Sequence, residues 1–273
     1  MRPLFFTFIG DEAHDYSAVW AAHPGWLAIT YEARDFARWC GLDEISPQTM
    51  ERWLRMWALV YVLDSLLDDT PLALRQKASE CFERMLTTAE ELPEWIDTDA
   101  ISLVALLRAA IEELEEGTWD TWVQTAFAIR DIGVLRADEY RSWPHLRLLV
   151  REAKLTAQLA FICMNAEERR RRIRYRRFAG AFTYLAIGGG LYDHARDLYG
   201  DHAYGLTAIQ PSRLNARLIL VRGILEVAKF LFYPRIATTL FRLRRHRPRL
   251  RLMAYWLENE AAMGRIQAEE LSA

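Results

Sequence analysis

Apolar residues with the periodicity of an α-helix run through almost the whole chain, and the pattern is broken mainly at proline and glycine. The 273 residues include 13 glycines and 9 prolines. No run of alternating strands with hairpin turns stands out. The pattern predicts an all-α fold, with boundaries good to about two to four residues. We expect helices at about 24–39, 47–68, 71–91, 98–116, 119–134, 137–165, 174–199, 212–231, 233–245 and 248–270.

The connections between these helices are short, and no Gly/Ser-rich linker divides the chain. Ser46 followed by Pro47 is typical of a helix start, with a capping residue before proline at the first helical position. Hydrophobic residues make up 52% of the chain, which is enough for a sizeable core. We therefore expect one all-α domain spanning residues 1–273.

Charge and cysteine content exclude several classes of protein. The formal net charge is −2, so the whole chain is not built to bind polyanions. The three cysteines, Cys40, Cys81 and Cys163, contain no CxxC pair and indicate neither a disulfide framework nor a zinc site. The N-terminus is a poor signal peptide, and no charge-free stretch reaches the roughly 18 residues of a membrane span. We expect a cytoplasmic protein, with peripheral contact to a membrane left open.

Three aspartates close the apolar helix predicted at 47–68. Asp64 and Asp68 are four residues apart and share one helix face, while Asp69 is turned to the side. Acidic side chains are rarely buried unless they are paired or bind a metal, and near a helix C-terminus they oppose the helix dipole. Towards the helix start, the same face carries Trp53, Trp57 and Tyr61. The alternative is a core helix with an exposed acidic end.

A second group of aspartates ends the helix predicted at 174–199. Asp193, Asp197 and Asp201 follow one another at four-residue spacing, so Asp193 and Asp197 again share a face. Towards the helix start, this face carries Phe178, Phe182, Ala186 and Gly189. Three consecutive glycines at 188–190 are unusual in a helix, where each costs roughly 0.5–1 kcal/mol relative to alanine. They indicate a kink, a wall thinned beside a ligand, or close packing of another helix.

The two acidic clusters can face each other across a helical bundle. Like charges about 4 Å apart repel by about 4 kcal/mol at an effective dielectric constant of 20. Carboxylates converging on one cavity would therefore need cations. Oxygen ligands favour Mg²⁺ or Mn²⁺ over zinc, and Mg²⁺ is usually completed by water and substrate phosphates. The expected ligand is then a diphosphate.

The sequences of the clusters resemble the aspartate-rich motifs of the class I isoprenoid synthases, which include terpene cyclases, squalene and phytoene synthases and trans-prenyl diphosphate synthases. The first motif is Asp64-Ser-Leu-Leu-Asp68-Asp69. The second, Arg196-Asp197-Leu-Tyr-Gly-Asp201, is similar to the second motifs of both the squalene/phytoene and the prenyl diphosphate synthase branches. This resemblance implies a single-domain bundle of about ten helices around a central cavity.

Departures from the family patterns favour one branch. The chain has no Gly-Gly-Lys-Arg segment of the chain-elongating enzymes near its N-terminus. Residues 159–165 do not match the Tyr-Cys…Val-Ala-Gly helix of squalene and phytoene synthases. The segment 193–201 is not the Asn…Ser…Glu motif of common bacterial sesquiterpene cyclases. What remains is similar to atypical bacterial terpene synthases with aspartates in both motifs, like the large-terpene synthases of bacilli.

The resemblance implies Mg²⁺-dependent ionisation of an allylic prenyl diphosphate, which releases diphosphate and forms a linear or cyclic terpene. Mn²⁺ is the other cation that would fit. The implied metal ligands are Asp64, Asp68, Asp69, Asp193, Asp197 and Asp201. Among these, Asp64, Asp68, Asp193 and Asp197 act in catalysis together with Arg196, which could pair with Asp197 or with a phosphate oxygen. The implied substrate-binding residues are Trp53, Trp57, Tyr61, Phe178, Phe182 and Gly189.

Two segments are rich in arginine, with seven arginines in 169–177 and six in 242–251. The simplest interpretation is a solvated surface. Attraction to anionic lipid headgroups, worth about 1 kcal/mol per basic residue, would instead give peripheral membrane contact. Binding of the diphosphate is a third interpretation. No nucleic-acid-binding motif accompanies the arginines, so we expect no nucleic-acid partner. A homodimer is left open.

Two other functions stay open at this point. One is a prenyltransferase that condenses two prenyl diphosphates, as squalene and phytoene synthases do. The other is a non-catalytic helical protein that binds a membrane or a partner and carries solvated acidic helix ends. Turnover of prenyl diphosphates in the presence of Mg²⁺ distinguishes the three.

Overall fold

The computed structural model divides the chain into two compact units, Met1–Phe230 and Leu231–Ala273. It describes residues 6–9, 12–15, 33–34, 36–38, 40–42, 45–68, 75–87, 108, 111 and 117–231. Apart from Leu231, these residues belong to the first unit.

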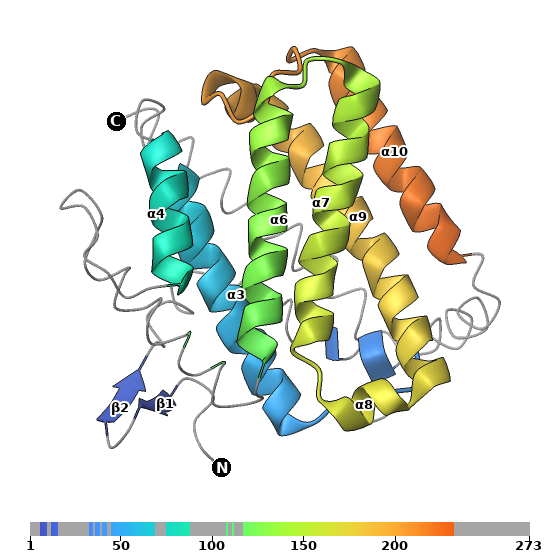
Figure 1. Cartoon of the computed structure of the whole chain (residues 1–273). Helices are drawn as coiled ribbons and strands as arrows, with labels where there is room; N and C mark the ends of the chain where they lie inside the picture. Colours follow the sequence, from blue (N-terminus) through green and yellow to red (C-terminus); the bar gives the residue numbers. More distant parts are fainter. Residues whose placement is uncertain are drawn as a thin grey trace, which may run out of the picture. The chain divides into compact units, whose positions relative to one another are not determined.

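The described part of the chain contains seven helices, which confirms the expected all-α class (Figure 1). They are α3 (Pro47–Asp68), α4 (Arg75–Thr87), α6 (Thr118–Asp138), α7 (Ser142–Ile162), α8 (Ala166–Arg170), α9 (Arg172–Ala203) and α10 (Arg213–Leu231). The predicted bounds of α3 are confirmed at both ends. The helix predicted at 137–165 is α7 with shorter ends. The helices predicted at 233–245 and 248–270 lie outside the described residues.

A small β-hairpin near the N-terminus was not predicted. Strand β1 (Phe6–Ile9) pairs antiparallel with β2 (Glu12–Asp15), so that Phe6 lies opposite Asp15 and Ile9 opposite Glu12. Each strand has four residues, and β2 reads Glu-Ala-His-Asp, which are not strand-favouring residues. So short and polar a strand gives no periodic signal in the sequence.

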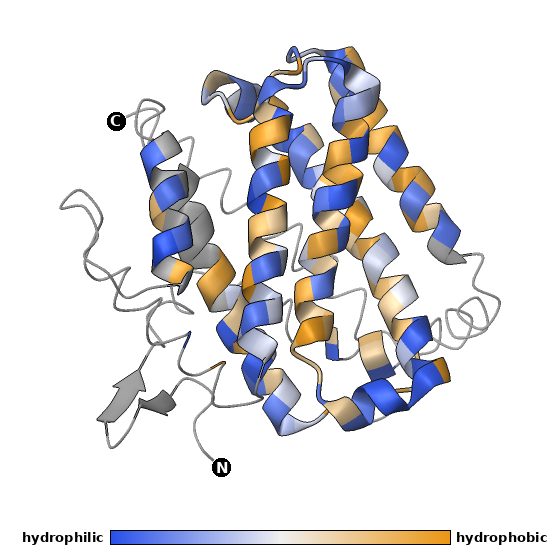
Figure 2. Cartoon of the chain, viewed as in Figure 1, coloured by the Kyte–Doolittle hydropathy of each residue, from blue (hydrophilic) through white to orange (hydrophobic). Residues whose placement is uncertain are grey.

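The best-packed part of the bundle is formed by α6, α7 and α9, whose hydropathy alternates between an apolar and a polar side (Figure 2). A core of apolar side chains joins α7 to α9 and to the start of α10. It contains Leu146, Leu149, Val150, Ala153, Ile187, Leu191, Leu198, Ile209 and Ile219. No helix in the described ranges combines the length and apolar character that crossing a membrane requires.

The short helix α8 holds the starts of α3 and α9 together. Glu168 is buried, and its Oε1 accepts a hydrogen bond from the backbone N–H of Ser46 at 2.7 Å. Its Oε2 accepts from the Thr49 hydroxyl at 2.7 Å and from the Asn165 N–H at 3.1 Å. Asn165 caps α8 in a reciprocal capping box with Glu168. Consequently α3 and α9 both start at α8 and lead away from it (Figure 1).

The three consecutive glycines of α9 differ in their surroundings. A Cβ on Gly188 would lie 2.2 Å from Cγ2 of Val227 and 3.6 Å from the carbonyl oxygen of Gly223, both on α10. Gly223 in turn lies close to Leu191 of α9. Gly189 is exposed, with open space around its Cβ position. Close helix packing, one of the interpretations drawn from the sequence, therefore accounts for Gly188.

Candidate functional site

The acidic ends of α3 and α9 lie at similar distances from α8. Trp53 of α3 contacts Phe178 of α9, with ring centroids 6.2 Å apart. Asp68 and Asp193 are each fifteen residues further along their helices, which is about 22 Å at the rise of an α-helix. Because both helices lead away from α8 (Figure 1), helix geometry carries both acidic ends towards the same end of the bundle.

An aromatic cluster connects α3, α7 and α9 on the side of α8. Trp53 and Phe178 are fully buried, and Phe182 lies 5.4 Å from Phe178 between ring centroids. Phe161 of α7 contacts both phenylalanines at 5.7 and 5.8 Å, and Phe36 contacts them at 6.2 and 6.4 Å. Three of the predicted substrate-binding aromatics therefore meet.

Sequence reasoning did not single out Phe36 and Phe161 as members of this cluster. Phe161 lies near the end of α7, and Phe36 lies in the helix predicted at 24–39, of which only a part is described. Neither lies in or next to an aspartate-rich motif. The available signal was the apolar periodicity of their helices, which predicts burial but does not predict the partner.

Arg196 bridges the two exposed aspartates of α9. Its Nη2 donates to Asp193 Oδ1 at 2.8 Å and to Asp197 Oδ2 at 2.7 Å, while its Nε donates to Asp197 Oδ1 at 2.8 Å. The side chains of Asp193, Arg196 and Asp197 are 61%, 47% and 43% exposed. The pairing of Arg196 with Asp197, one of the two alternatives drawn from the sequence, is thus present, and Asp193 also pairs with Arg196.

The carboxyl of Asp193 has a shifted pKa. Partial removal of water by the surrounding protein raises the pKa of Asp193 above its ordinary value, although solvent still reaches much of the side chain. The carboxylates of Asp197 and Asp201 raise it further, whereas Arg196 and His194 lower it. Three carboxylates, with Arg196 and His194 among them, thus act on one another at this end of α9.

Asp201 lies in a separate polar cluster with His194, Glu152 and Arg136. Oδ2 of Asp201 is 3.4 Å from Nδ1 of His194. Nη1 of Arg136 is 2.8 Å from His194 Nε2 and 3.1 Å from Glu152 Oε2. Arg136 is buried, and its Nε has no hydrogen-bond partner. This cluster joins α6, α7 and α9, and within it Asp201 lies beside His194.

His145 lies next to this cluster and is buried. Its Nε2 is 3.3 Å from the Thr207 hydroxyl, and its Nδ1 has no hydrogen-bond partner. Burial, followed by the positive charges of Arg136 and His194, lowers the pKa of His145 to about 4. Arg136, His145 and Glu152 were not among the predicted site residues, because they come from other helices and form no motif in the sequence.

The remaining predicted site residues are described only in part. The backbone of Asp64 and Asp68 belongs to the last turns of α3. The side chains of Asp64, Asp68 and Tyr61 lie outside the described part of the structure, and so does the whole of Asp69. Trp57 is buried. Among the described side chains, no three of the types His, Cys, Asp and Glu are grouped so as to hold a metal ion.

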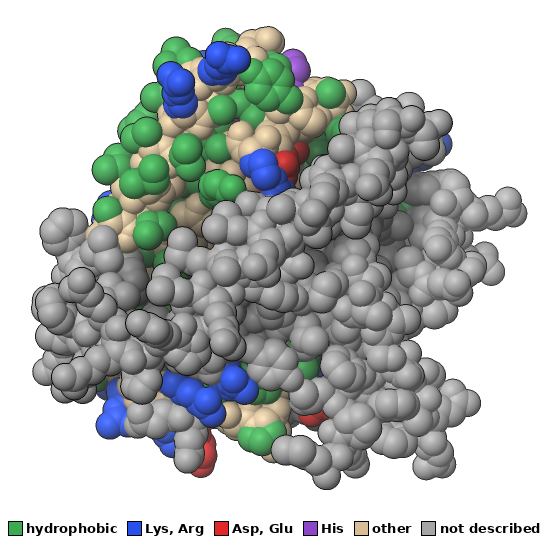
Figure 3. All heavy atoms as spheres, turned by 180° about the vertical axis from the view of Figure 1, so that it is seen from behind, with side chains coloured by type: hydrophobic (Ala, Val, Ile, Leu, Met, Phe, Trp, Pro, Cys, Tyr) green, Lys and Arg blue, Asp and Glu red, His purple; other side chains and the backbone are tan. Residues whose placement is uncertain are grey.

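The first arginine-rich segment lies at the opposite end of α9 from the aspartates. Arg177 precedes Asp193 by sixteen residues, or about 24 Å along the helix axis. Lys and Arg side chains gather where α8 and α9 begin, at the lower left of Figure 3. These arginines are therefore too far away to contact a diphosphate held at Asp193. The second segment, 242–251, lies outside the described residues.

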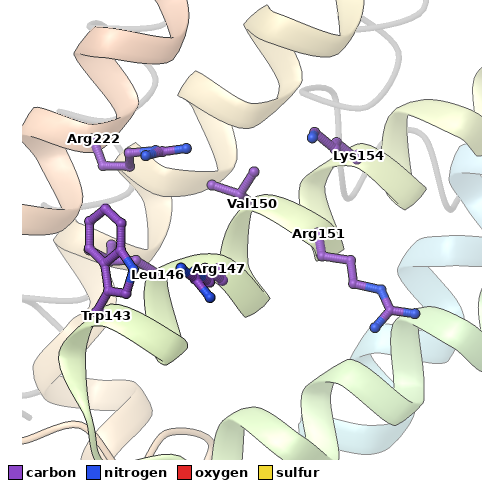
Figure 4. A pocket seen from close by; sticks show the side chains of 7 residues that line it. All are labelled: Trp143, Leu146, Arg147, Val150, Arg151, Lys154 and Arg222. Carbon is purple, nitrogen blue, oxygen red and sulfur yellow. The ribbon is translucent and has the colours of Figure 1, made fainter.

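A pocket of about 260 Å³ lies between α7 and α10 (Figure 4). It is lined by Trp143, Leu146, Arg147, Val150, Arg151, Lys154 and Arg222. Four of the seven side chains are basic, and none belongs to the predicted catalytic residues. The pocket is thus a separate feature from the acidic end of α9.

Comparison of the chain with protein-family models, with curated proteins and with solved structures finds no match.

Proposed function

We propose that this chain is an Mg²⁺-dependent class I terpene synthase that ionises an allylic prenyl diphosphate. The observation that supports this best is the contact between Trp53 and Phe178, together with the equal spacing from it to Asp68 and Asp193. One acidic end on each of two helices, above a shared aromatic cluster, is the arrangement that the resemblance implies.

The donor set fits Mg²⁺, which takes oxygen ligands and usually keeps one or two carboxylates per ion. Asp193 and Asp197 would hold one side of the cation site, and Asp64 and Asp68 the other. Both described aspartates are accessible, and their partner Arg196 is about half exposed, so it can turn away at little cost. The bound cation would supply Lewis-acid polarisation of the diphosphate.

The protein side chains have three tasks in this proposal. The carboxylates would hold the cations, which when bound would fix the diphosphate in place. Arg196 exchanges its two carboxylate partners for a diphosphate oxygen, for which its planar donor fork is suited. The aromatic cluster would close the far, apolar end of the site, about 22 Å from the acidic ends, and shield the tail of the prenyl chain from water.

Incubation with geranyl, farnesyl, geranylgeranyl and longer prenyl diphosphates in the presence of Mg²⁺ tests the proposal. We expect diphosphate release with a hydrocarbon or alcohol product formed from a single substrate molecule. A product with twice the carbon number would instead identify a prenyltransferase of the squalene or phytoene type.

The matched variants are Asp197→Asn and Asp131→Asn. Asp131 is an exposed aspartate that also pairs with a neighbouring arginine, Arg130 at 2.9 Å, but it lies on α6. We expect at least a 100-fold loss of turnover for the first change, because each lost metal or oxyanion contact typically costs that much, and none for the second. Absence of turnover with every substrate would leave the non-catalytic function as the better account.

A further inference from the structure

The pocket between α7 and α10 carries more positive charge than the carboxylates of the described residues neutralise. Arg147, Arg151 and Lys154 are exposed on α7 and form no ion pair within the described part of the chain. The guanidinium of Arg147 lies over the ring of Trp143, 5.7 Å from its centroid. Like charges held this close together repel one another, so an anion at the pocket would relieve the repulsion.

Arg222 connects the pocket to α10. Its Nη2 is 2.7 Å from Oε1 of the buried Glu226, which also pairs with Lys229. The single buried carboxylate of Glu226 thus pairs with both Arg222 and Lys229. One positive charge on this side of α10 therefore remains unneutralised by it. Leu218 and Leu225 lie four residues before and three residues after Arg222, so they are its neighbours on the helix surface.

The outward side of α10 is apolar. Its hydrophobic side chains are between 37% and 67% exposed, and they are Leu214, Leu218, Leu220, Val221, Ile224 and Leu225. Figure 3 shows hydrophobic side chains gathered over α10, at the upper left of the view. An exposed apolar patch of this extent on a surface helix marks a binding surface. We call α10's exposed residues and the adjoining pocket the α10 face.

We propose that the α10 face docks onto a membrane that contains anionic lipids. An amphipathic helix with an apolar side and basic flanks lies in the lipid–water interface. Tryptophan side chains prefer the level of the headgroups, where Trp143 would lie. Lipid phosphates would occupy the pocket among Arg147, Arg151 and Lys154. A second copy of the chain fits less well, because it would bring the same cations against each other.

Sedimentation of the full chain with vesicles tests this docking. The probes are vesicles of phosphatidylcholine alone and vesicles of phosphatidylcholine mixed with phosphatidylglycerol. We expect binding to the mixed vesicles that weakens as salt is added. Combining Arg147→Glu with Arg151→Glu should weaken it at least about 25-fold, since each basic residue near an anionic surface is worth about five-fold in affinity. Leu218→Gln with Leu225→Gln should also weaken binding.

A matched control reverses two exposed arginines at the other end of the bundle, Arg170→Glu with Arg172→Glu. It changes the net charge by the same amount and should leave vesicle binding within about two-fold. Circular dichroism confirms that each variant is folded. Binding lost in the control but kept in the α7 variant would overturn the proposal, as would equal binding to both kinds of vesicle.

Light scattering without vesicles tests whether a second copy of the chain binds the α10 face instead. If the chain is a dimer that the two leucine changes convert to a monomer, the α10 face belongs to a second copy and the membrane proposal is wrong. The vesicle test does not depend on catalysis, so its failure leaves the proposed terpene synthase activity standing, and failure of that activity leaves the docking standing.

Discussion

At the scale of single residues, the polar side chains of the bundle owe their properties to partners from other helices. His145 lies in the first turns of α7, but the side chains around it belong to other segments. They are Arg136 of α6, His194 of α9 and Thr207 beyond α9. The sequence around His145 contains none of these partners. Its burial was therefore predictable from helix periodicity, whereas its altered acidity was not.

The stability of the protein should fall in acid because of His145. Its pKa is about 4 when folded and about 6.5 when unfolded, so the unfolded chain binds the extra proton between these values. The contribution of His145 to the free energy of unfolding is then fully present above pH 6.5. It decreases by at most about 3 kcal/mol as the pH falls to 4. His145→Gln should remove this decrease, as measured by urea unfolding at pH 7 and pH 4.5. Equal pH dependence in both proteins would contradict the assignment.

At the scale of helices, sequence patterns predict the bounds of a helix correctly where capping or helix-breaking residues mark its ends. Ser46 and Pro47 set the start of α3, and its predicted bounds are those of the structure. Helix α8 is different, because its five residues are too few for a periodic pattern. Its capping box is local, between Asn165 and Glu168, but the hydrogen bonds that Glu168 accepts from Ser46 and Thr49 join residues more than a hundred positions apart.

Glu168→Ala should destabilise the protein by about 3 kcal/mol. The change leaves the Ser46 N–H and the buried Thr49 hydroxyl without their acceptor, and each unsatisfied buried group costs about 1–3 kcal/mol. The Asn165 N–H keeps only its longer bond to Thr49 Oγ1, at 3.3 Å. The neighbouring Glu167 is exposed, so Glu167→Ala should change the free energy of unfolding by less than about 0.5 kcal/mol. Denaturant unfolding of both variants measures the difference; similar values for the two would show that Glu168 does not hold α3 and α9 together.

The contact between α9 and α10 gives a second test at this scale. Gly188→Ala should cost about 1–3 kcal/mol, because the new methyl group would meet Val227. Gly189→Ala, with open space around it, should instead stabilise by about 0.5–1 kcal/mol through helix propensity. Adding Val227→Ala to Gly188→Ala should recover part of the loss. If both glycine variants are stabilised, the close approach of the two helices is wrong.

At the scale of the whole molecule, the candidate site was predicted as two helix faces and not as a three-dimensional arrangement. Helix spacing correctly grouped Asp193 with Asp197, and Trp53, Phe178 and Phe182 do meet. It gave no account of Asp201, which shares the four-residue spacing but lies beside His194. The difference arises because periodicity defines a face, while the helices packed against that face decide which side chains are drawn away from it.

The proposed function requires that the acidic ends of α3 and α9 form one site. Calorimetry measures the Mg²⁺-dependent binding of inorganic diphosphate most directly. The proteins to compare are the unchanged chain, Asp64→Asn, Asp197→Asn and the double variant. Groups that act on one ligand together give non-additive losses. We predict that each single change weakens binding at least about ten-fold and that the double change is weaker than the poorer single variant by less than about three-fold. Losses that add in full in the double variant, or single variants that bind like the unchanged protein, would contradict the claim.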